Sequence, residues 1–179
     1  DNVTVMLTDL VNFTQIASEL HPETVIEELN DLFTNFDSFI EENNCERIKT
    51  IGDAYLAVCG MPEQNENHAI NILKAAQCMI KYLKKRNEIH DIKWDIRIGI
   101  HTGSVVGGVV GVKKYIYDIF GDTINTTSRI ENSSQPMQIS ISEMTYQLVK
   151  DDFGFEMVQS VEIKGKGTIN IYRVCNNID

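Results

Sequence analysis

Apolar and polar positions follow two patterns along the chain, one typical of strands and one typical of helices. Residues 3–7 form a short apolar run that indicates a buried strand. A helix is expected to begin near Pro22, because proline suits the first helical turn and Glu23 lies near the positive end of the helix dipole. Residues 25–40 and 69–83 carry apolar side chains three or four positions apart, which predicts two helices that each bury one face.

A β-hairpin is predicted between these two helices. Residues 47–51 and 54–59 are strand-like runs, and the Gly52 and Asp53 that separate them are common turn residues. A polar loop over residues 62–67 then leads into the second helix. The first half of the chain therefore predicts a strand, a helix, a hairpin and a helix, in that order.

The second half of the chain predicts more strands around one further helix. Strands are expected over residues 92–101, 103–111 and 115–120, and Asp122 can cap a helix that continues through Arg129. The chain is completed by a segment over 137–142, a short helix to Lys150, and strands near Phe155, Ile163 and residues 169–174. This order predicts an α+β fold with a ferredoxin-like βαββαβ sandwich core, appended C-terminal strands and helices, and a single domain over residues 1–179.

Composition and charge exclude several classes of protein. The chain has 179 residues, of which 42% are apolar, enough for the core of one domain. Its net charge of −10 argues against a nucleic acid partner, because such a partner requires a basic surface. No apolar run reaches 18 residues, so no membrane span is expected within this segment. The four cysteines lack metal-ligand spacing and are expected to be free thiols.

The start of the chain suggests its context. It begins almost directly in a strand, with neither an initiator Met nor a signal peptide. We therefore expect a domain cut from a longer protein and located in the cytoplasm, either free or as the cytosolic part of a membrane-anchored parent.

Two acidic residues indicate the chemistry. Asp9 follows the first apolar strand and Asp53 lies in the predicted hairpin turn, so the fold could bring them side by side at one edge of a sheet. Two adjacent carboxylates repel each other unless a cation neutralises them, and their hard oxygens suit Mg²⁺ or Mn²⁺. Such a pair is typical of two-metal attack at phosphorus. The alternative is that Asp53 is only a turn residue and Asp9 only a strand end.

Four segments together resemble a known family. They are residues 7–14 (LTDLVNFT), 48–55 (IKTIGDAY), 97–103 (RIGIHTG) and 120–129 (FGDTINTTSR). In this order and at these separations they resemble the class III nucleotidyl cyclase catalytic domain, over residues 3–174. Members of that family convert a nucleoside triphosphate to its 3′,5′-cyclic monophosphate and pyrophosphate with two divalent ions, at sites formed between two domains.

The resemblance implies a cation site and a phosphate loop. Asp9 and Asp53 are expected to hold two Mg²⁺ or Mn²⁺ ions, together with the Leu10 carbonyl. The loop that contains Phe13 and Thr14 is expected to contact the substrate phosphates.

The phosphate loop departs from the family at one position. The family usually has glycine where this chain has Asn12, and asparagine tolerates a positive φ better than most residues. We therefore expect the loop to keep its conformation.

The resemblance also implies residues that act on the ribose and on the phosphates. Asn125 is expected to orient the ribose, and Arg129 to stabilise the pentacovalent transition state. They lie four positions apart, hence on one face of the predicted helix. Lys164 resembles the family lysine that contacts the terminal phosphates, and Lys166 is the nearby alternative for that role.

Two further positions bear on the choice of base. The family recognises the purine where this chain has Lys49 and Asp118, and guanylyl cyclases typically carry Glu and Cys there. A cationic donor and a carboxylate acceptor match adenine, which presents an acceptor at N1 and a donor at N6. The sequence therefore predicts an adenylyl cyclase that acts on ATP, with a guanylyl cyclase as the alternative.

The distribution of these residues predicts the assembly. In the family the cation ligands come from one domain, whereas the base, ribose and phosphate residues come from the other. This chain carries both sets, so a homodimer with two equivalent sites is expected. Two other classes stay open: a catalytically silent cyclase-like regulatory or dimerisation module, and a polymerase-like palm domain, which the lack of a basic groove disfavours.

Overall fold

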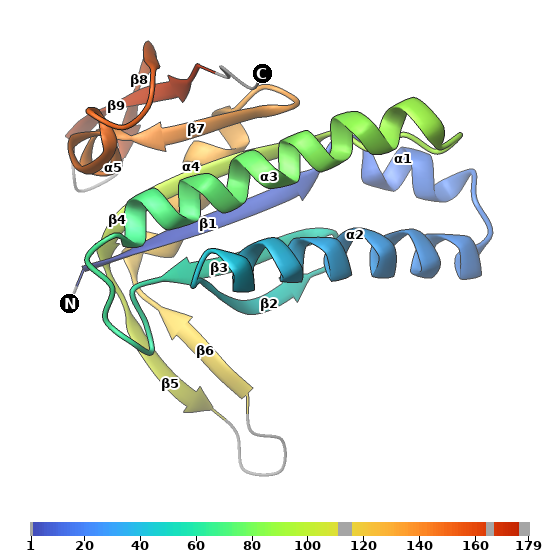
Figure 1. Cartoon of the computed structure of the whole chain (residues 1–179), viewed down its shortest axis with the longest axis horizontal. Coiled ribbons are helices and arrows are strands. Elements are labelled where there is room, and N and C mark those ends of the chain that lie inside the picture. The colour runs from blue at the N-terminus through green and yellow to red at the C-terminus, as the bar shows by residue number, and fades with distance from the viewer. Residues whose placement is uncertain (1, 111–115, 164–166, 176–179) are drawn as a thin grey trace.

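The computed structural model describes residues 2–110, 116–163 and 167–175, and it has a mixed α+β architecture (Figure 1). The strands are β1 (Asn2–Leu10), β2 (Glu46–Ile51), β3 (Ala54–Cys59), β4 (Ile96–Ser104), β5 (Val106–Val110), β6 (Ile116–Phe120), β7 (Gln138–Ser142), β8 (Phe155–Ile163) and β9 (Gly167–Val174). The helices are α1 (Phe13–Ser18), α2 (Pro22–Glu42), α3 (His68–Ile89), α4 (Asp122–Ser133) and α5 (Glu143–Val149).

Seven of these strands form one sheet in the order β2-β3-β1-β4-β7-β9-β8. The first four neighbours, β2, β3, β1 and β4, pair antiparallel, as in a ferredoxin-like βαββαβ core. Strand β7 then joins β4 in parallel, and the β8–β9 hairpin extends the sheet. The predicted fold class, including the appended C-terminal elements, is confirmed.

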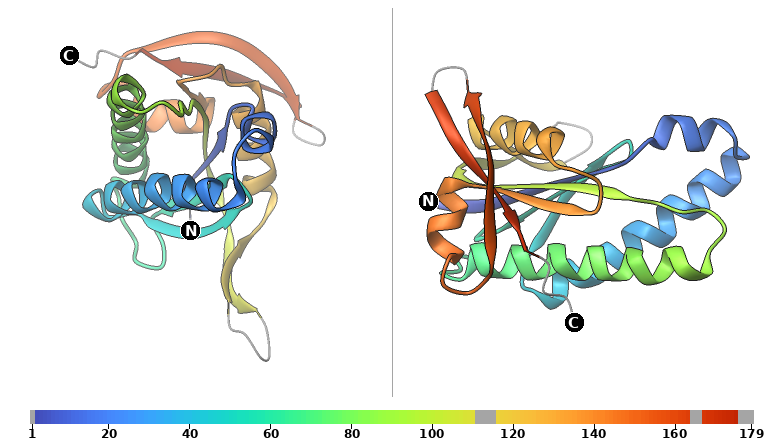
Figure 2. Two further views of the ribbon diagram at one scale, coloured as in Figure 1. Left: turned by 90° about the vertical axis from the view of Figure 1, so that its right-hand side faces the viewer. Right: turned by 90° about the horizontal axis from the view of Figure 1, so that it is seen from above.

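Helices cover the central strands on both faces, as Figures 1 and 2 show. The alternation of side chains along β1 explains how: Met6 and Leu10 point into the larger core under α2 and α3, whereas Val3 and Val5 point to the opposite face. Ile124 of α4 packs on that second face. The face that bears α4 also bears Asp9, because residue 9 has the same parity as residues 3 and 5.

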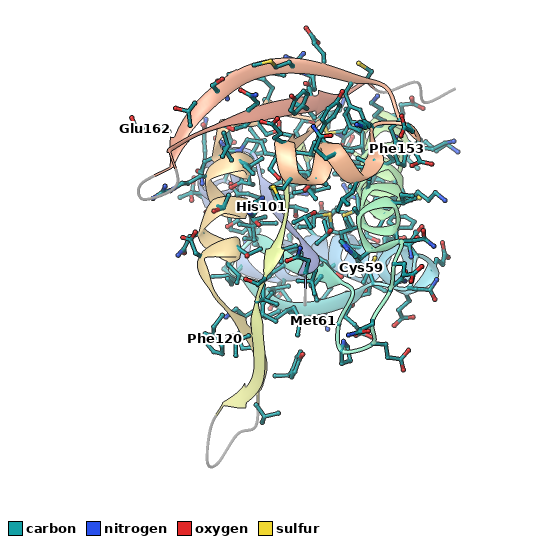
Figure 3. The ribbon with its side chains drawn as sticks, turned by 90° about the vertical axis from the view of Figure 1, so that its left-hand side faces the viewer. Cys59, Met61, His101, Phe120, Phe153 and Glu162 are labelled. Carbon is teal, nitrogen blue, oxygen red and sulfur yellow. The ribbon has the colours of Figure 1, made fainter. Side chains whose placement is uncertain are left out.

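Strands β5 and β6 form a separate two-stranded sheet that projects from the body as an arm (Figure 1). Val106 pairs with Phe120 where the arm meets the body, and Gly108 pairs with Asp118 further along. Figure 3 shows Phe120 at the junction of the arm with α4. Several apolar side chains of this arm are exposed: Val106, Val109, Tyr117 and Phe120.

The structure corrects the predicted boundary of one strand. The strand expected from residue 92 begins at Ile96. The Asn87 side chain bonds both the backbone N–H and the backbone carbonyl of Trp94, at 3.0 and 2.9 Å, and so ties this segment to the end of α3. These bonds use backbone groups that a longer strand would need for pairing.

Other corrections concern the turns and helix ends. Gly103 belongs to β4 and not to a separate strand. The residue that precedes α4 is Gly121, and Asp122 is the first residue of the helix rather than its cap. The short helix α1 was not predicted. Within the described ranges, no helix has both the length and the apolar character that crossing a membrane requires.

Candidate active site

The first feature of the site is a pair of carboxylates from two neighbouring segments. Asp9 lies near the end of β1, and Asp53 lies in the turn between β2 and β3. Since Thr8 pairs with Tyr55, this turn reaches the same edge of the sheet as the end of β1. Gly52 permits the turn through its positive φ of 63°. Partial burial, a hydrogen bond shared with Asp9 and the charge of that residue raise the pKa of Asp53 to about 6.

An open pocket of about 400 Å³ surrounds these two residues, and we call it the carboxylate pocket. It is lined by Asp9, Leu10, Asn12, Phe13, Thr14, Gln15, Asp53 and Arg97. The residues expected to hold cations and to contact phosphates therefore lie together. Asn12 has a left-handed conformation, with φ 57° and ψ 26°, which asparagine accepts more readily than most residues.

Arg97 belongs to this pocket, although sequence reasoning assigned it no role. It is directly opposite Asp9 in the β1–β4 pairing, and its Nη2 donates to Asp9 Oδ2 at 2.7 Å. The sequence did offer one sign that Arg97 matters: it begins the segment 97–103, one of the four segments that resemble a known family. Only the strand register shows that this position faces Asp9.

Glu131 of α4 lies on the other side of Arg97, with Oε1 3.3 Å from the arginine Nε. The residue is only 3% exposed. Burial, and secondarily the charges of Asp9 and Asp53, raise its pKa to about 7 against the opposing effect of Arg97. Sequence reasoning missed it, because a glutamate in an amphipathic helix is most simply a solvated residue.

A glycine explains how Glu131 comes so close to the sheet. A Cβ atom added at Gly99 of β4 would lie 2.3 Å from the backbone nitrogen of Glu131, closer than any real contact. The absence of a side chain at this position therefore lets α4 lie directly on β4. The same close approach brings Glu131 beside Arg97, two residues earlier on the strand.

The second feature of the site is an ion pair between β2 and β6. Lys49 Nζ lies 2.5 Å from Asp118 Oδ2, and the other carboxylate oxygen accepts a hydrogen bond from the Ile119 backbone N–H at 2.8 Å. Burial acts to raise the pKa of Asp118, but the hydrogen bonds from Lys49 and Ile119 outweigh it and hold the pKa below its ordinary value. Asp118 is therefore a carboxylate at neutral pH.

The remaining predicted residues do not line the carboxylate pocket. Asn125 and Arg129 lie one turn apart on α4, and both are exposed. Within the part of the chain that the structure describes, neither forms a hydrogen bond or an ion pair with a side chain. Lys164 and Lys166 fall outside the described residues.

The carboxylate pocket matches the ligand chemistry of hard divalent cations. Two carboxylates that share a hydrogen bond and face an open pocket supply the oxygen ligands that Mg²⁺ and Mn²⁺ prefer. No group of three or more His, Cys, Asp or Glu side chains in the described ranges is arranged to hold a metal ion. A cation site here would therefore rely on two carboxylates, a backbone oxygen such as that of Leu10, and the substrate.

Comparison with known proteins places this geometry in context. The protein-family model named adenylate and guanylate cyclase catalytic domain matches residues 1–176 of this chain. Receptor-type guanylate cyclase gcy-28 from Caenorhabditis elegans is 40% identical over 177 residues, which cover 96% of this chain. The chain spans only 14% of the length of that relative.

Solved structures agree with the sequence comparison. A guanylate cyclase domain from Catenaria anguillulae in complex with GTP superposes with a TM-score of 0.93 at 35% identity, over 98% of this chain and 96% of that one. The catalytic core of a rhodopsin-guanylyl cyclase with converted specificity, in complex with ATPαS, gives a TM-score of 0.91 at 36% identity, over 97% and 95% of the two chains.

Proposed function

The chain belongs to the family of adenylate and guanylate cyclase catalytic domains, and on that premise we propose that it converts ATP to 3′,5′-cyclic AMP and pyrophosphate. The observation that carries the choice of ATP is the Lys49–Asp118 ion pair. It offers one cationic donor and one carboxylate acceptor at the positions where the family recognises its base.

The polarity of this pair favours adenine. Lys49 can donate to the N1 acceptor of adenine, and Asp118 can accept from the N6 amino group. Guanine presents the reverse pattern, a donor at N1 and an acceptor at O6. A mismatched buried polar group costs about 1–3 kcal/mol, so two mismatches would favour ATP by roughly 10²-fold or more.

A specific observation favours GTP as the second candidate. The curated relative gcy-28 is a guanylate cyclase by name, and the Catenaria domain was solved in complex with GTP. Common descent therefore supports a guanylyl cyclase, whereas the two base-recognition residues support an adenylyl cyclase. We give more weight to the residues, because hydrogen-bond polarity acts on the base directly.

The carboxylate pocket supports a role for two Mg²⁺ or Mn²⁺ ions. Asp9 and Asp53 would hold them, with the Leu10 carbonyl as a further ligand. Divalent ions supply acidity to the ribose 3′-hydroxyl and neutralise charge on the α-phosphate and the pyrophosphate. The raised pKa of Asp53 supports this role, because burial and the neighbouring Asp9 both disfavour its charged form and a bound cation would favour that form.

Four cationic or polar side chains complete the proposed chemistry. Arg97 lines the carboxylate pocket and is placed to contact the triphosphate there. Asn125 would orient the ribose, and Arg129 would stabilise the negative charge that develops on the transferred phosphoryl group. We propose the terminal phosphates as the target of Lys164, as the sequence predicts.

A homodimer would bring the two sets of residues together. Arg129 is exposed on α4 and does not line the carboxylate pocket of its own chain, so a second copy is the economical source of the transition-state arginine. The exposed apolar side chains of the β5–β6 arm support such an association, with Val106 71% and Phe120 46% exposed. We propose two equivalent sites per dimer.

A direct assay tests the substrate. Concentrated protein is incubated with Mn²⁺ and either ATP or GTP, and the cyclic product is identified by chromatography and mass spectrometry. We expect cyclic AMP in excess by roughly 10²-fold in kcat/KM. Predominant cyclic GMP would establish the second candidate. Bound nucleotide without any cyclic product would favour a silent regulatory module.

A complementation assay tests the shared sites. Asp53→Ala and Arg129→Ala chains are expected to be inactive alone and to regain activity when mixed, because one of the two sites in the mixed dimer keeps both residues. A mixture that stays inactive, although both variants fold and associate, would contradict the shared-site dimer.

A further inference from the structure

The guanidinium of Arg97 lies between two acids that come from different elements. Its Nη2 donates to Asp9 Oδ2 of β1 at 2.7 Å, and its Nε lies 3.3 Å from Glu131 Oε1 of α4. Only the contact with Asp9 is an aligned hydrogen bond. The Arg97 Nε and the Glu131 Oε1 are both buried, and neither has a hydrogen-bond partner within the described residues.

This unsatisfied contact is unusual, because buried polar atoms are nearly always hydrogen-bonded. Here both facing atoms of the Arg97–Glu131 ion pair lack a hydrogen bond, while the same guanidinium makes a short hydrogen bond to Asp9. The geometry is that of one cation shared by two carboxylates, with Asp9 holding the better position. A modest shift of Arg97 away from Asp9 would let it align with Glu131.

The two members of the Arg97–Glu131 pair differ in how freely they can move. The Glu131 side chain is 4% exposed, and its backbone is held against β4 by the close approach at Gly99. The Arg97 side chain is 28% exposed and borders the open carboxylate pocket. Glu131 is therefore the fixed member of the pair, and Arg97 is the member that can shift.

We propose that Glu131 is a positioning residue that competes with Asp9 for the Arg97 guanidinium and so makes Asp9 available to divalent cations. The inference rests on the proposed function, in which Asp9 is a cation ligand. A guanidinium bonded to Asp9 Oδ2 occupies a lone pair that a cation would use. By attracting Arg97, Glu131 lowers the free-energy cost of that exchange.

Replacing Glu131 by Gln should then weaken the binding of divalent cations, because Arg97 would no longer be drawn away from Asp9. Asp9 would be the remaining acid in contact with the guanidinium among the described residues, so their pairing would tighten. Loss of a negative charge near the cations would also weaken their binding, without any role for Arg97. The two explanations separate in an Arg97→Gln background, where only the direct charge effect persists.

The experiment measures Mn²⁺ binding to the purified chain without nucleotide, by the electron paramagnetic resonance signal of the free ion. It is done at pH 8.0, where Glu131 is ionised. We expect Glu131→Gln to weaken binding by about 3- to 10-fold, and Arg97→Gln to tighten it by a similar factor, since one Coulombic contact of a partly exposed ion is changed. Adding Glu131→Gln to Arg97→Gln should change binding by less than about two-fold. Arg173→Gln, which removes the same charge from β9, is the matched control.

Several outcomes would overturn the proposal. One is an equal loss of affinity from Glu131→Gln in both backgrounds, and another is an Arg97→Gln chain that binds Mn²⁺ no more tightly. If Glu131→Gln does not fold, an Arg97→Gln chain that binds Mn²⁺ no more tightly than the wild type still overturns the proposal. Asp53→Asn should abolish binding. A wild-type chain that binds no Mn²⁺, or an Asp53→Asn chain that binds it equally well, overturns the cation site itself and this inference with it.

Discussion

Two pairs of charged side chains in this molecule are built in opposite ways. Asp9 and Asp53 are acids held close together, and burial together with this proximity raises the pKa of Asp53 to about 6. Lys49 and Asp118 are opposite charges, and their ion pair lowers the pKa of Asp118. The first pair has a cationic partner only on its Asp9 side, from Arg97, whereas the second is an ion pair that is complete without any ligand.

This difference separates affinity for cations from choice of substrate. A repulsive pair gains most from a bound cation, so it drives binding and chemistry. A satisfied pair gains little from any ligand, but it penalises a base whose donors and acceptors are reversed. We therefore expect changes in the first pair to affect the rate with either nucleotide, and changes in the second to affect mainly the ratio of the two rates.

The largest effect is expected from Asp53→Asn. It keeps the shape of the turn but removes one of two cation ligands, so cyclase activity should fall by roughly 10³-fold or more with both ATP and GTP. Initial rates at saturating Mn²⁺ measure this. Asp37→Asn is the matched control, because Asp37 pairs with Arg47 away from the pocket. An Asp53→Asn chain with more than a tenth of wild-type activity would contradict the cation assignment.

A smaller and more selective effect is expected from the double substitution Lys49→Glu with Asp118→Cys. It reverses the donor and acceptor of the second pair, so the preference between ATP and GTP should shift towards GTP by roughly 10²-fold. The measurement is kcat/KM for each nucleotide. Lys49→Glu alone is the control: it sets two carboxylates face to face and should impair both substrates. An unchanged ratio in the double variant would remove these residues from base recognition.

The smallest effect is expected on thermal stability. Asp53 and Glu131 have pKa values raised from 3.8 and 4.5 to about 6 and about 7, so the folded protein binds protons that the unfolded chain has lost. The free energy of unfolding should therefore fall as the pH rises from about 4 to about 7. A loss of a few degrees in Tm between pH 5 and pH 8 is expected, measured by scanning calorimetry without divalent ions.

Two controls sharpen the pH experiment. Asp53→Asn should flatten the decrease, and Mn²⁺ should offset it at pH 8. The Lys49–Asp118 pair has the opposite sign: the lowered pKa of Asp118 contributes stability that is lost as the pH falls below about 4. A Tm that rises steadily from pH 5 to pH 8 would contradict the raised pKa values.

Much of the fold was predictable because local patterns agreed with the tertiary structure. The hairpin was placed within one residue, since Gly52-Asp53 separates two clear strand-like runs. The start of α2 was also predicted correctly, because the helix begins at Pro22. The start of β4 was not predictable, because the Asn87 side chain withdraws the backbone of Trp94 from pairing. Such a bond between side chain and backbone leaves no periodic signal.

The candidate site was predictable in part for a related reason. Asp9 and Asp53 could be paired from the sequence because each closes an apolar run at one edge of the sheet. Arg97 and Glu131 could not be added, because their roles depend on strand register and on the close approach at Gly99. Those are long-range facts that neither charge nor periodicity encodes.

The β2–β3 hairpin would connect the two reaction centres of the proposed dimer. Lys49 and Asp53 are four residues apart on the same β2–β3 ribbon, yet in the proposed dimer they serve opposite reaction centres. In that dimer, a movement of this ribbon would displace one residue of each centre. We therefore expect the two centres of a dimer to respond to nucleotide cooperatively, and a mixed dimer with only one competent centre to lose that cooperativity.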